Sequence, residues 1–540
     1  MILRRQGNLD SSGMVENCDK KVGPLVSVLI PTFNRPRYLS EALASALDQS
    51  YRNLQVIIIN DGGEDVSGVV NSLSDPRIIF INRKENRGKA FSLNEALDRA
   101  GGKYIAYLDD DDLYYPNHIE TLVDALENRT DCQVAYSDLY KAHCKVMPDG
   151  SRQVLSKVVN VSRDFDRFFM LYFNHALHVS LMHHRSLIEK TGFYNEELNV
   201  LIDWDMTRRF AFFSDFHHVY EITGEFYSSV GESDRISVQR RKNKDEYSRN
   251  IMMIRTTRPP KPWPKIEDLS IIFVAPDRLD QVAAKTLGSI WRYTFYPYEV
   301  YLPLPQTDFN RLNTNMPNII PVPVDPLASE GERIDAALAR CEGEYVAIVP
   351  RGFAVDEMWV ENPLHALIDS SVRTHVSCEG FELEGSTDTL WAAVVRRGNL
   401  QYARRNFSNL PVRESLKAAG VVLRQPSFEE LPFQFDNLLQ QAQLAEQDGN
   451  WAQAAQMFGY IAEHHQNELN MKALAAKAFF KAGDHRRATK LSCEVNRERP
   501  TVDTLLLEAK ANRKERNFNS AIGLLKRAEQ ILEGKELLWT

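Results

Sequence analysis

The stretch VSVLIPTFNRPRYLSEALASALDQSYRNLQVIIINDG, residues 26–62, contains the pattern on which the fold depends. It joins two apolar runs, residues 26–31 and 55–60, through residues 38–49, which have the apolar spacing of a helix. The alternation continues through RIIFINR, AFSLNEALDRA and KYIAYL, and the last run leads into four aspartates, residues 109–112. Apolar strands that alternate with amphipathic helices predict an α/β fold, with a mostly parallel sheet covered on both faces. Open sheets of this kind bind ligands at the carboxyl ends of their strands.

The composition is that of a globular protein with several domains. The chain has 540 residues, 43% of them hydrophobic and 26% charged, and this length predicts about three or four domains. A formal net charge of −8 argues against a general nucleic-acid-binding protein. No apolar run approaches the roughly 18 residues of a transmembrane helix, and the N-terminus lacks the pattern of a signal peptide. Six scattered cysteines favour reduced thiols over a disulfide framework or a zinc site.

The domain boundaries follow from changes in pattern. Residues 1–24 are polar and predict a flexible tail, residues 25–257 form the first α/β domain, and RPPKPWPK, residues 258–265, predicts a stiff linker. The pattern then begins again over residues 266–432, where LSIIFVAPDR mirrors VSVLIPTFNR and ALARCEGEYVAIVPRGF mirrors ALDRAGGKYIAYLDDDD. In this second copy Pro305, Pro350 and Gly352 fall opposite Asp61, Asp109 and Asp111, which predicts a degenerate domain that has lost its carboxylates.

The last part of the chain, residues 433–540, lacks strand signals and is rich in Ala, Leu, Gln and Lys. Three short segments, GNWAQAA, GDHRRAT and RNFNSAI, place Ala454, Ala488 and Ala521 in register. A spacing of about 34 residues is the period of tetratricopeptide repeats, in which a small residue lies where two helices cross. We therefore expect a helical repeat domain at this end.

The run of aspartates at residues 109–112 is the strongest chemical signal. Four adjacent carboxylates repel one another, and a divalent cation such as Mg²⁺ or Mn²⁺ is the usual partner of such hard oxygen ligands. The alternative is a cluster in the first turn of a helix, which the helix dipole would favour.

Residues 26–62 and ENRGKAFSLNEALDRAGGKYIAYLDDDDLYYP resemble the nucleotide-binding half of family 2 glycosyltransferases with the GT-A fold, a Rossmann-like architecture. The resemblance covers about residues 25–230 and includes several motifs in the family's order. It implies transfer of a sugar from a nucleotide-diphosphate donor to an acceptor hydroxyl, with a divalent metal and inversion of the anomeric centre.

The resemblance also implies roles for individual residues. Asp111 would bind the metal together with Asp109, which would also lie near the donor ribose. Asp110 would assist by contacting the donor, and Asp112 would be a further auxiliary carboxylate. Asp61 would contact the base, although the preceding family aspartate is replaced by Asn60, and locally Asp61 is equally well explained as a turn former. The other implied donor-binding positions are Pro31, Thr32, Phe33, Arg87, Gly88, Lys89 and Asn94. The last four also fit a solvated turn and helix cap.

The segment GFYNEELNVLIDWDMTRR, residues 192–209, resembles the family's acceptor-side motif. Asp203 then corresponds to the general base, with Trp204 and Asp205 on the acceptor side. Ile202 replaces the family's glutamate, and an N-cap role explains Asp203 equally well from the local pattern. Adjacent histidines, at residues 183–184 and 217–218, predict packing rather than metal binding, and Arg235 is a weak candidate for the diphosphate.

The favoured hypothesis is a metal-dependent inverting glycosyltransferase, with a UDP-sugar as the expected donor and a glycan or protein as acceptor. Bacterial surface glycan assembly or protein glycosylation would fit this architecture, and the helical repeats would bind a protein partner. The alternative is a non-catalytic scaffold in which both α/β domains are structural. We expect a cytoplasmic protein, with possible peripheral association at the inner membrane face through basic residues such as 240–242.

Overall fold

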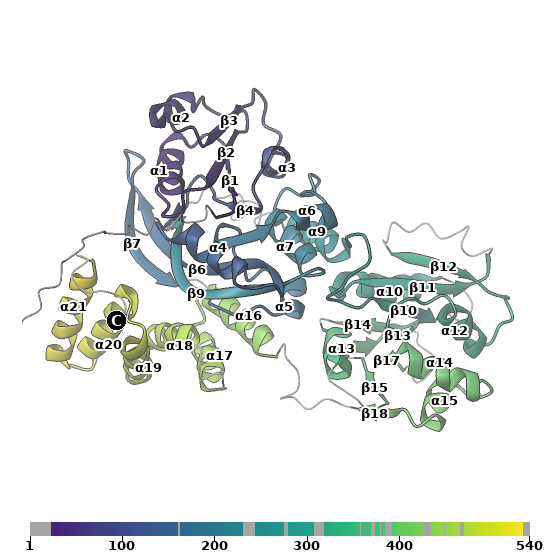
Figure 1. The fold of residues 1–540 in the computed structure, drawn as a ribbon. Coiled ribbons are helices and arrows are strands. Elements are labelled where there is room, and N and C mark those ends of the chain that lie inside the picture. The colour runs from purple at the N-terminus through teal and green to yellow at the C-terminus, as the bar shows by residue number, and fades with distance from the viewer. Residues whose placement is uncertain are drawn as a thin grey trace, which may run out of the picture.

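A computed structural model of the chain describes residues 23–159, 162–229, 244–274, 279–306, 318–356, 358–368, 373–378, 380–383, 391–424, 434–447, 449–464 and 469–532. The predicted tail lies almost entirely outside this range, as do Arg235 and residues 240–242. Figure 1 shows two α/β units and a set of C-terminal helices.

The first α/β unit is built on a nine-stranded sheet with the order β3-β2-β1-β4-β8-β6-β9-β5, in which β7 also pairs with β6. The first four strands are parallel, as the alternating pattern predicts, but β8 runs antiparallel to both β4 and β6. The sheet is therefore mixed, and the predicted parallel arrangement holds for one half only. The strands are β1 (Val26–Thr32), β2 (Leu54–Asn60), β3 (Ile78–Asn82), β4 (Tyr104–Tyr107), β5 (Leu113–Tyr114), β6 (Cys132–Val146), β7 (Arg152–Val159), β8 (Leu181–His184) and β9 (Asp215–Ser229).

Helices cover both faces of this sheet because successive strand residues point to opposite sides. Val28 and Ile30 of β1 belong to one buried cluster, and Leu29 between them belongs to the cluster on the other face. The helices are α1 (Pro36–Leu47), α2 (Ser67–Leu73), α3 (Lys89–Arg99), α4 (His118–Glu127), α5 (Arg167–Tyr172), α6 (Ser186–Thr191), α7 (Ile202–Phe210) and α9 (Lys244–Thr256), with a 3₁₀ turn at His178–Ser180.

The second unit repeats the strand order of the first. Its seven-stranded sheet runs β12-β11-β10-β13-β17-β15-β18, which corresponds position by position to β3-β2-β1-β4-β8-β6-β9. The parallel and antiparallel pairings also correspond. The strands are β10 (Leu269–Val274), β11 (Tyr298–Leu304), β12 (Ile319–Pro323), β13 (Tyr345–Pro350), β15 (Thr374–Ser377), β17 (Ala393–Arg396) and β18 (Val422–Arg424), and a separate pair is β14 (Phe353–Val355) and β16 (Gly380–Glu382).

Helices again flank the second sheet, and one of its two cores continues into the first unit. Phe169, Leu171 and Tyr172 of α5, together with Phe212, belong to the same buried cluster as Leu269, in β10. The two units therefore share packed apolar surface beside the linker (Figure 1). The helices of the second unit are α10 (Gln281–Tyr293), α12 (Glu330–Leu338), α13 (Glu361–Ile368), α14 (Arg397–Asn406) and α15 (Val412–Ala418).

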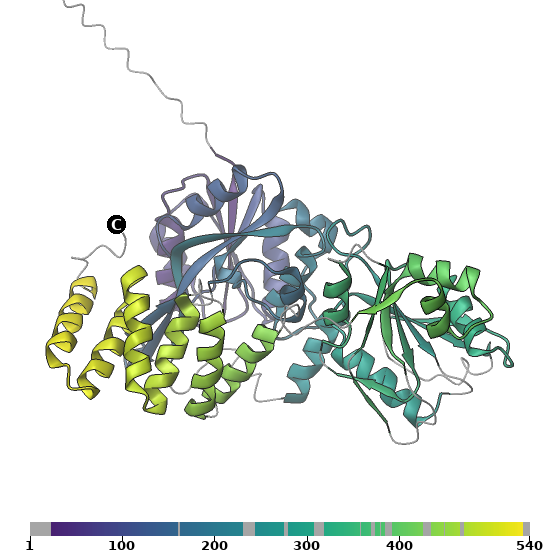
Figure 2. The ribbon, with the colours of Figure 1, turned by 90° about the horizontal axis from the view of Figure 1, so that it is seen from below.

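The C-terminal part consists of successive helices that lie in a row beside the first unit (Figure 2). Each packs on its neighbour in sequence, and Ala454, Ala488 and Ala521 are buried, as expected for small residues at helix crossings. The row contacts the first unit near its C-terminal end, where α20 packs on β7 and Arg499 pairs with the buried Asp138 of β6 at 3.3 Å. The helices are α16 (Gln434–Gln447), α17 (Trp451–His464), α18 (Leu469–Ala482), α19 (His485–Glu498), α20 (Val502–Lys514) and α21 (Phe518–Leu532).

Two further expectations are addressed by the structure. Within the described ranges, no helix combines the length and apolar character needed to cross a membrane. The five cysteines in those ranges are free thiols, and three of them are buried, as the scattered spacing predicts.

Candidate active site

The candidate site lies at the carboxyl ends of β1, β2 and β4. These strands are parallel neighbours, so the residues that follow them meet at one edge of the sheet. Thr32 ends β1, Asp61 follows β2, and residues 109–112 follow β4 after Leu108.

Three of the four consecutive aspartates are close enough to share one ion. Asp109, Asp111 and Asp112 each offer a carboxylate oxygen, and these oxygens lie within 4.8 Å of one another. Hard carboxylate oxygens at an open sheet edge suit Mg²⁺ or Mn²⁺, and few protein ligands leave coordination positions for a diphosphate. The chain enters strand β5 directly after Asp112, and α4 begins only at His118. The alternative of a first-turn helix cluster is therefore wrong.

Asp110 lies outside this group of three. Its carboxylate accepts hydrogen bonds from the Thr32 hydroxyl at 2.8 Å and from the Phe33 backbone N–H at 3.4 Å. Burial and the neighbouring Asp111 raise the pKa of Asp110 to about 6, although the positive charge of Arg35 acts to lower it. Asp110 thus ties the end of β1 to the end of β4, a structural role that differs from the donor contact predicted for it.

Two cations offset the negative charge of the aspartates. The Arg35 guanidinium bridges Asp110 at 3.2 Å and Asp111 at 2.9 Å, and the Lys89 ammonium lies 2.6 Å from Asp109. Burial disfavours the charged lysine, but Asp109, together with Asp203 and Asp111, raises the pKa of Lys89 above its usual value. Both cations are thus held in the same cluster as the carboxylates.

Asp61 organises the loop that leads into α3. Its two carboxylate oxygens accept the backbone N–H groups of Arg87 and Gly88, each at 2.8 Å, and Arg83 forms an ion pair with it at 3.1 Å. Gly88 has a φ of +94°, a conformation that glycine adopts without strain. This loop brings Lys89, the first residue of α3, to Asp109.

Asp203 reaches the cluster from a distant part of the chain. Helix α7 begins one residue before it, so Asp203 lies in the first turn and is not the N-cap. Asn174 donates a hydrogen bond to its carboxylate at 3.1 Å. Burial raises the pKa of Asp203, while the positive charge of Lys89 opposes the rise and Asp109 adds to it. Asp203 therefore lies close enough to Lys89 and Asp109 for their charges to act on its pKa.

Three predicted site residues have different surroundings from those expected. Asn94 exchanges hydrogen bonds with the backbone of Tyr194, so it fastens α3 to a loop rather than facing a donor. Trp204 is buried, and its indole N–H donates to the Met170 carbonyl at 2.9 Å. Asp205 is buried in an ion pair with Arg209 at 2.7 Å. The acceptor-side positions predicted for Trp204 and Asp205 are therefore corrected to packing and structural positions inside the unit.

The remaining predicted positions line the site edge. Phe33 is 43% exposed at the end of β1, and Pro31 lies in the strand just before it. The Arg87 side chain is exposed, and its guanidinium stacks on the Phe91 ring at 3.2 Å. These side chains are available to a ligand at the sheet edge.

Sequence reasoning missed several residues that shape the site. Arg35, directly after the PTFN segment, carries the ion pairs to Asp110 and Asp111, and Asn174 carries the hydrogen bond to Asp203. Arg152 of β7 donates to the Asp111 carbonyl, and its guanidinium lies 3.5 Å from the centre of the Tyr227 ring. Nothing in the local pattern around Asn174 or Arg152 indicated these contacts, because their partners are distant in sequence.

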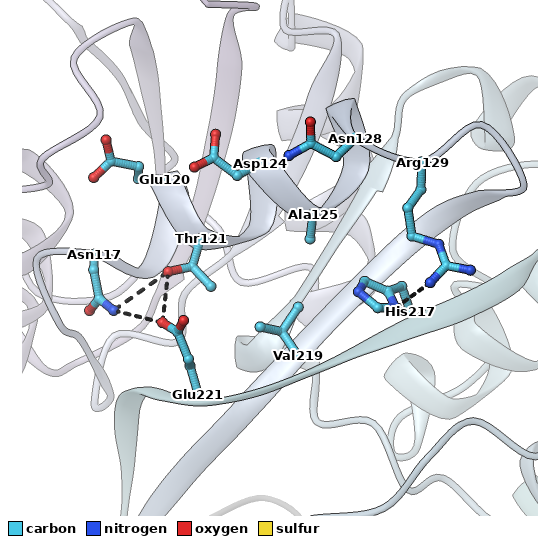
Figure 3. A pocket seen from close by; sticks show the side chains of 10 residues that line it. All are labelled: Asn117, Glu120, Thr121, Asp124, Ala125, Asn128, Arg129, His217, Val219 and Glu221. Atoms are coloured by element: carbon cyan, nitrogen blue, oxygen red, sulfur yellow. Dashed lines mark hydrogen bonds between the residues drawn. The ribbon is translucent and has the colours of Figure 1, made fainter. Parts of the chain in front are cut away.

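A separate surface pocket of about 510 Å³ lies between α4 and β9 (Figure 3). At one end Asn117 and Thr121 hydrogen-bond to Glu221, and at the other Arg129 meets His217. None of the predicted site residues lines this pocket. This pocket is therefore separate from the acidic sheet edge, where the predicted site residues lie.

Part of this chain is similar to known glycosyltransferases. The model of the glycosyl transferase family 2 matches residues 27–184. An uncharacterized glycosyltransferase of Rickettsia prowazekii is 29% identical over 204 residues, which are 37% of this chain and 62% of that protein. A chondroitin synthase of Pasteurella multocida is 31% identical over 235 residues, 43% of this chain and 23% of the synthase. The chain thus spans about three fifths of the Rickettsia relative.

Among solved structures, residues 1–349 of Staphylococcus aureus TarS are 16% identical, with a TM-score of 0.32, covering 43% of this chain and 64% of that one. The family match covers Asp61 and all four consecutive aspartates but ends before Asp203. Residues 27–184, which match the glycosyl transferase family 2 model, thus lie within the first mixed α/β unit, and further α/β and helical parts follow it.

Proposed function

We propose that the first α/β unit is an active, metal-dependent, inverting glycosyltransferase. The observation that carries this proposal is the meeting of two separate motifs: Lys89 pairs with Asp109 of the acidic turn and interacts electrostatically with Asp203 from α7. A metal-binding turn and a candidate base are the two parts that an inverting transfer needs. Both lie at the edge where open α/β sheets bind ligands.

Asp111 and Asp109, with Asp112 beside them, would hold Mn²⁺ or Mg²⁺. The bound metal would stabilise the charge that develops on the leaving diphosphate. The oxygen of the acceptor hydroxyl would bond to the anomeric carbon while the bond from that carbon to the diphosphate breaks. Asp203 would accept the proton that the hydroxyl loses. A raised pKa suits this role, because a more basic carboxylate is a better proton acceptor.

The donor would lie against the loops after β1 and β2. The exposed Phe33 ring and the loop held by Asp61 form the expected binding region for the base and ribose, with Pro31 and Thr32 behind them. Arg87, Gly88 and Lys89 lie toward the diphosphate side of this region. A UDP-sugar is the expected donor, and a hydroxyl of a glycan or protein is the expected acceptor.

For the rest of the chain, we propose a degenerate GT-A-like domain over residues 266–432 and tetratricopeptide-type repeats over residues 433–540. The repeated strand order supports the first proposal, and the buried alanines at the helical period support the second. A process such as bacterial surface glycan assembly or protein glycosylation would use such a chain. In the alternative, a non-catalytic scaffold, the first unit would bind no nucleotide.

A thermal-shift titration tests the proposal. UDP, GDP and dTDP are added with and without Mn²⁺ to the wild type, to Asp111→Asn and to Asp131→Asn, a control at an exposed aspartate paired with Arg129. A ligand at about 100 times its dissociation constant stabilises the folded state by roughly 2.7 kcal/mol. We expect one nucleotide to raise the Tm of the wild type and the control only with Mn²⁺, and Asp111→Asn to lose this response. Folded wild type without any response would favour the scaffold.

A further inference from the structure

We propose that the second α/β unit holds the candidate base Asp203 in its working position, and that Arg208 is the positioning residue that joins the two units. The inference rests on the proposed function, because it assigns the second unit a part in the same transfer. It gives a role to a domain that lacks carboxylates at the positions opposite Asp61, Asp109 and Asp111.

Arg208 lies on α7, the same helix that carries Asp203, and it is fully buried. Its guanidinium donates hydrogen bonds to the carbonyl oxygens of Arg255 at 2.8 Å and Thr257 at 2.6 Å, at the end of α9. The third bond crosses to the second unit, where the Phe295 carbonyl accepts at 3.0 Å. A planar guanidinium with several fixed donors sets an orientation as well as a distance, which a lysine cannot do.

The Phe295 carbonyl is itself held by the second unit. The Glu361 carboxylate, at the start of α13, accepts the backbone N–H groups of Phe295 and Tyr296, each at 3.0 Å. Glu361 is fully buried, and this burial raises its pKa to about 7. The contact from α7 therefore ends on a rigid, internally bonded part of the second unit.

A second connection reaches Asp203 through α5. Tyr172 of that helix is buried in the core of the second unit, with its ring centre 5.1 Å from that of Phe295. Asn174, just beyond the end of α5, donates the hydrogen bond to the Asp203 carboxylate. Asp203 is thus positioned by its own helix and by Asn174, and both of these supports are anchored in the second unit.

Such anchoring matters because proton transfer requires the base to lie within hydrogen-bond reach of the acceptor hydroxyl. A displacement of about 1 Å can cost about 100-fold in rate. Donor and metal binding depend instead on the loops after β1, β2 and β4, which are held by hydrogen bonds and ion pairs within the first unit. The inference therefore predicts an effect on kcat without an effect on donor binding.

The test compares Arg208→Lys with Arg333→Lys. Arg333 is a matched control, because it is also buried and also donates to three backbone carbonyls, those of Ala328, Pro303 and Pro326, but on the other face of the second sheet. The readouts are Mn²⁺-dependent nucleotide binding and release of nucleoside diphosphate from UDP-glucose, UDP-N-acetylglucosamine and GDP-mannose by hydrolysis, in which water accepts the sugar. We expect Arg208→Lys to lower kcat about 10-fold or more with unchanged nucleotide Kd, and Arg333→Lys to keep the wild-type kcat.

A second variant, Phe295→Leu, changes only the second unit and keeps an apolar side chain, so it tests the inference even if Arg208→Lys does not fold. It should also lower kcat without changing nucleotide affinity. In both variants the acid limb of the kcat–pH profile should move to lower pH, because a displaced Asp203 is better solvated.

The inference would be overturned if Phe295→Leu kept the kcat and the pH profile of the wild type while Asp203→Asn lost activity. The same result in Arg208→Lys, where that variant folds, would also overturn it. If the wild type binds no nucleotide with Mn²⁺, the proposed function fails first and the inference falls with it. Loss of nucleotide affinity in Arg208→Lys, equal to the loss in kcat, would also overturn it.

Discussion

Arg351 and Asp280 form an ion pair in the second unit, with the guanidinium Nε 3.0 Å from a carboxylate oxygen, where the first unit pairs Arg35 with Asp110. Asp280 is the N-cap of α10, as Arg35 is of α1, and Arg351 falls opposite Asp110 in the turn after the fourth strand of the sheet order. An ion pair thus joins the helix N-cap to the turn in both units, but the cation is at the N-cap in the first unit and in the turn in the second. In the second unit the pair neutralises itself, whereas in the first the acidic turn also carries Asp109, Asp111 and Asp112, whose carboxylate oxygens lie within 4.8 Å of one another.

We expect Arg351→Ala to leave the Mn²⁺-dependent nucleotide response unchanged. The pair is partly exposed, so its loss should lower the free energy of unfolding by only about 0–1 kcal/mol. Arg35→Ala should cost more, about 1–3 kcal/mol, because it leaves the buried Asp110 without its cation. Thermal shift and urea unfolding measure both effects. A nucleotide response abolished by Arg351→Ala would contradict the assignment of the site to the first unit.

Lys89 provides a test of the metal cluster without any nucleotide. Lys89→Met removes the cation next to Asp109, so we expect the metal-free protein to lose about 1–2 kcal/mol of unfolding free energy. Mn²⁺ alone should then raise the Tm of the variant more than that of the wild type, because the ion replaces the missing charge. Lys103→Met, at an exposed pair with Glu127, is the control and should change little. An equal or smaller Mn²⁺ effect in Lys89→Met would count against a cation site here.

The buried Glu361 predicts a pH dependence of stability. Burial raises the pKa of Glu361 in the folded state to about 7, although its two backbone N–H partners and Arg255 act to lower it. In the unfolded chain the carboxyl titrates near 4.5. Between these pH values the folded state binds a proton that the unfolded state has lost, so stability falls as pH rises from about 4.5 to 7. The contribution is on the order of 3 kcal/mol. Urea unfolding of Glu361→Gln across this range should show a shallower fall than the wild type, and parallel curves would refute the assignment.

Attachment of the helical repeats to the first unit can be tested at Arg499. This side chain pairs with Asp138, a buried β6 residue that also accepts a hydrogen bond from His218 at 2.9 Å. We expect Arg499→Ala to speed amide hydrogen exchange in α20 and β7, because it weakens their shared interface. Arg487→Ala, at an exposed pair within α19, should leave exchange in β7 unchanged. Equal exchange in both variants would mean that the pair does not hold the repeats in place.

Much of the architecture could be predicted from local pattern. The apolar runs at residues 26–31 and 55–60 became β1 and β2 with nearly the same limits, and the internal repeat appears as two sheets with one strand order. These features depend on side-chain periodicity, which is local in sequence. The antiparallel half of the first sheet was not predicted, because β8 lies between β4 and β6 through a long-range connection that periodicity does not encode.

The site was predictable in its residue types but less so in its orientations. Lys89 pairs with Asp109 at the sheet edge, yet Asp110 hydrogen-bonds to Thr32, and Trp204 is buried in the core. Adjacent residues on a turn or helix face different directions, and a motif match does not specify which direction each one takes. The link from Arg208 to Phe295 joins two domains and has no signature in either segment.

The most direct test of the account is the release of nucleoside diphosphate from UDP- and GDP-sugars in the presence of Mn²⁺, with water as the acceptor of the sugar. The wild type should turn over one of these donors, EDTA should stop the reaction, and Asp203→Asn should lose about 100-fold or more in kcat while still binding the nucleotide. Asp131→Asn should behave like the wild type. Undiminished release by Asp203→Asn, or no release by folded wild type that binds nucleotide, would contradict the proposal that this chain catalyses sugar transfer at the acidic sheet edge.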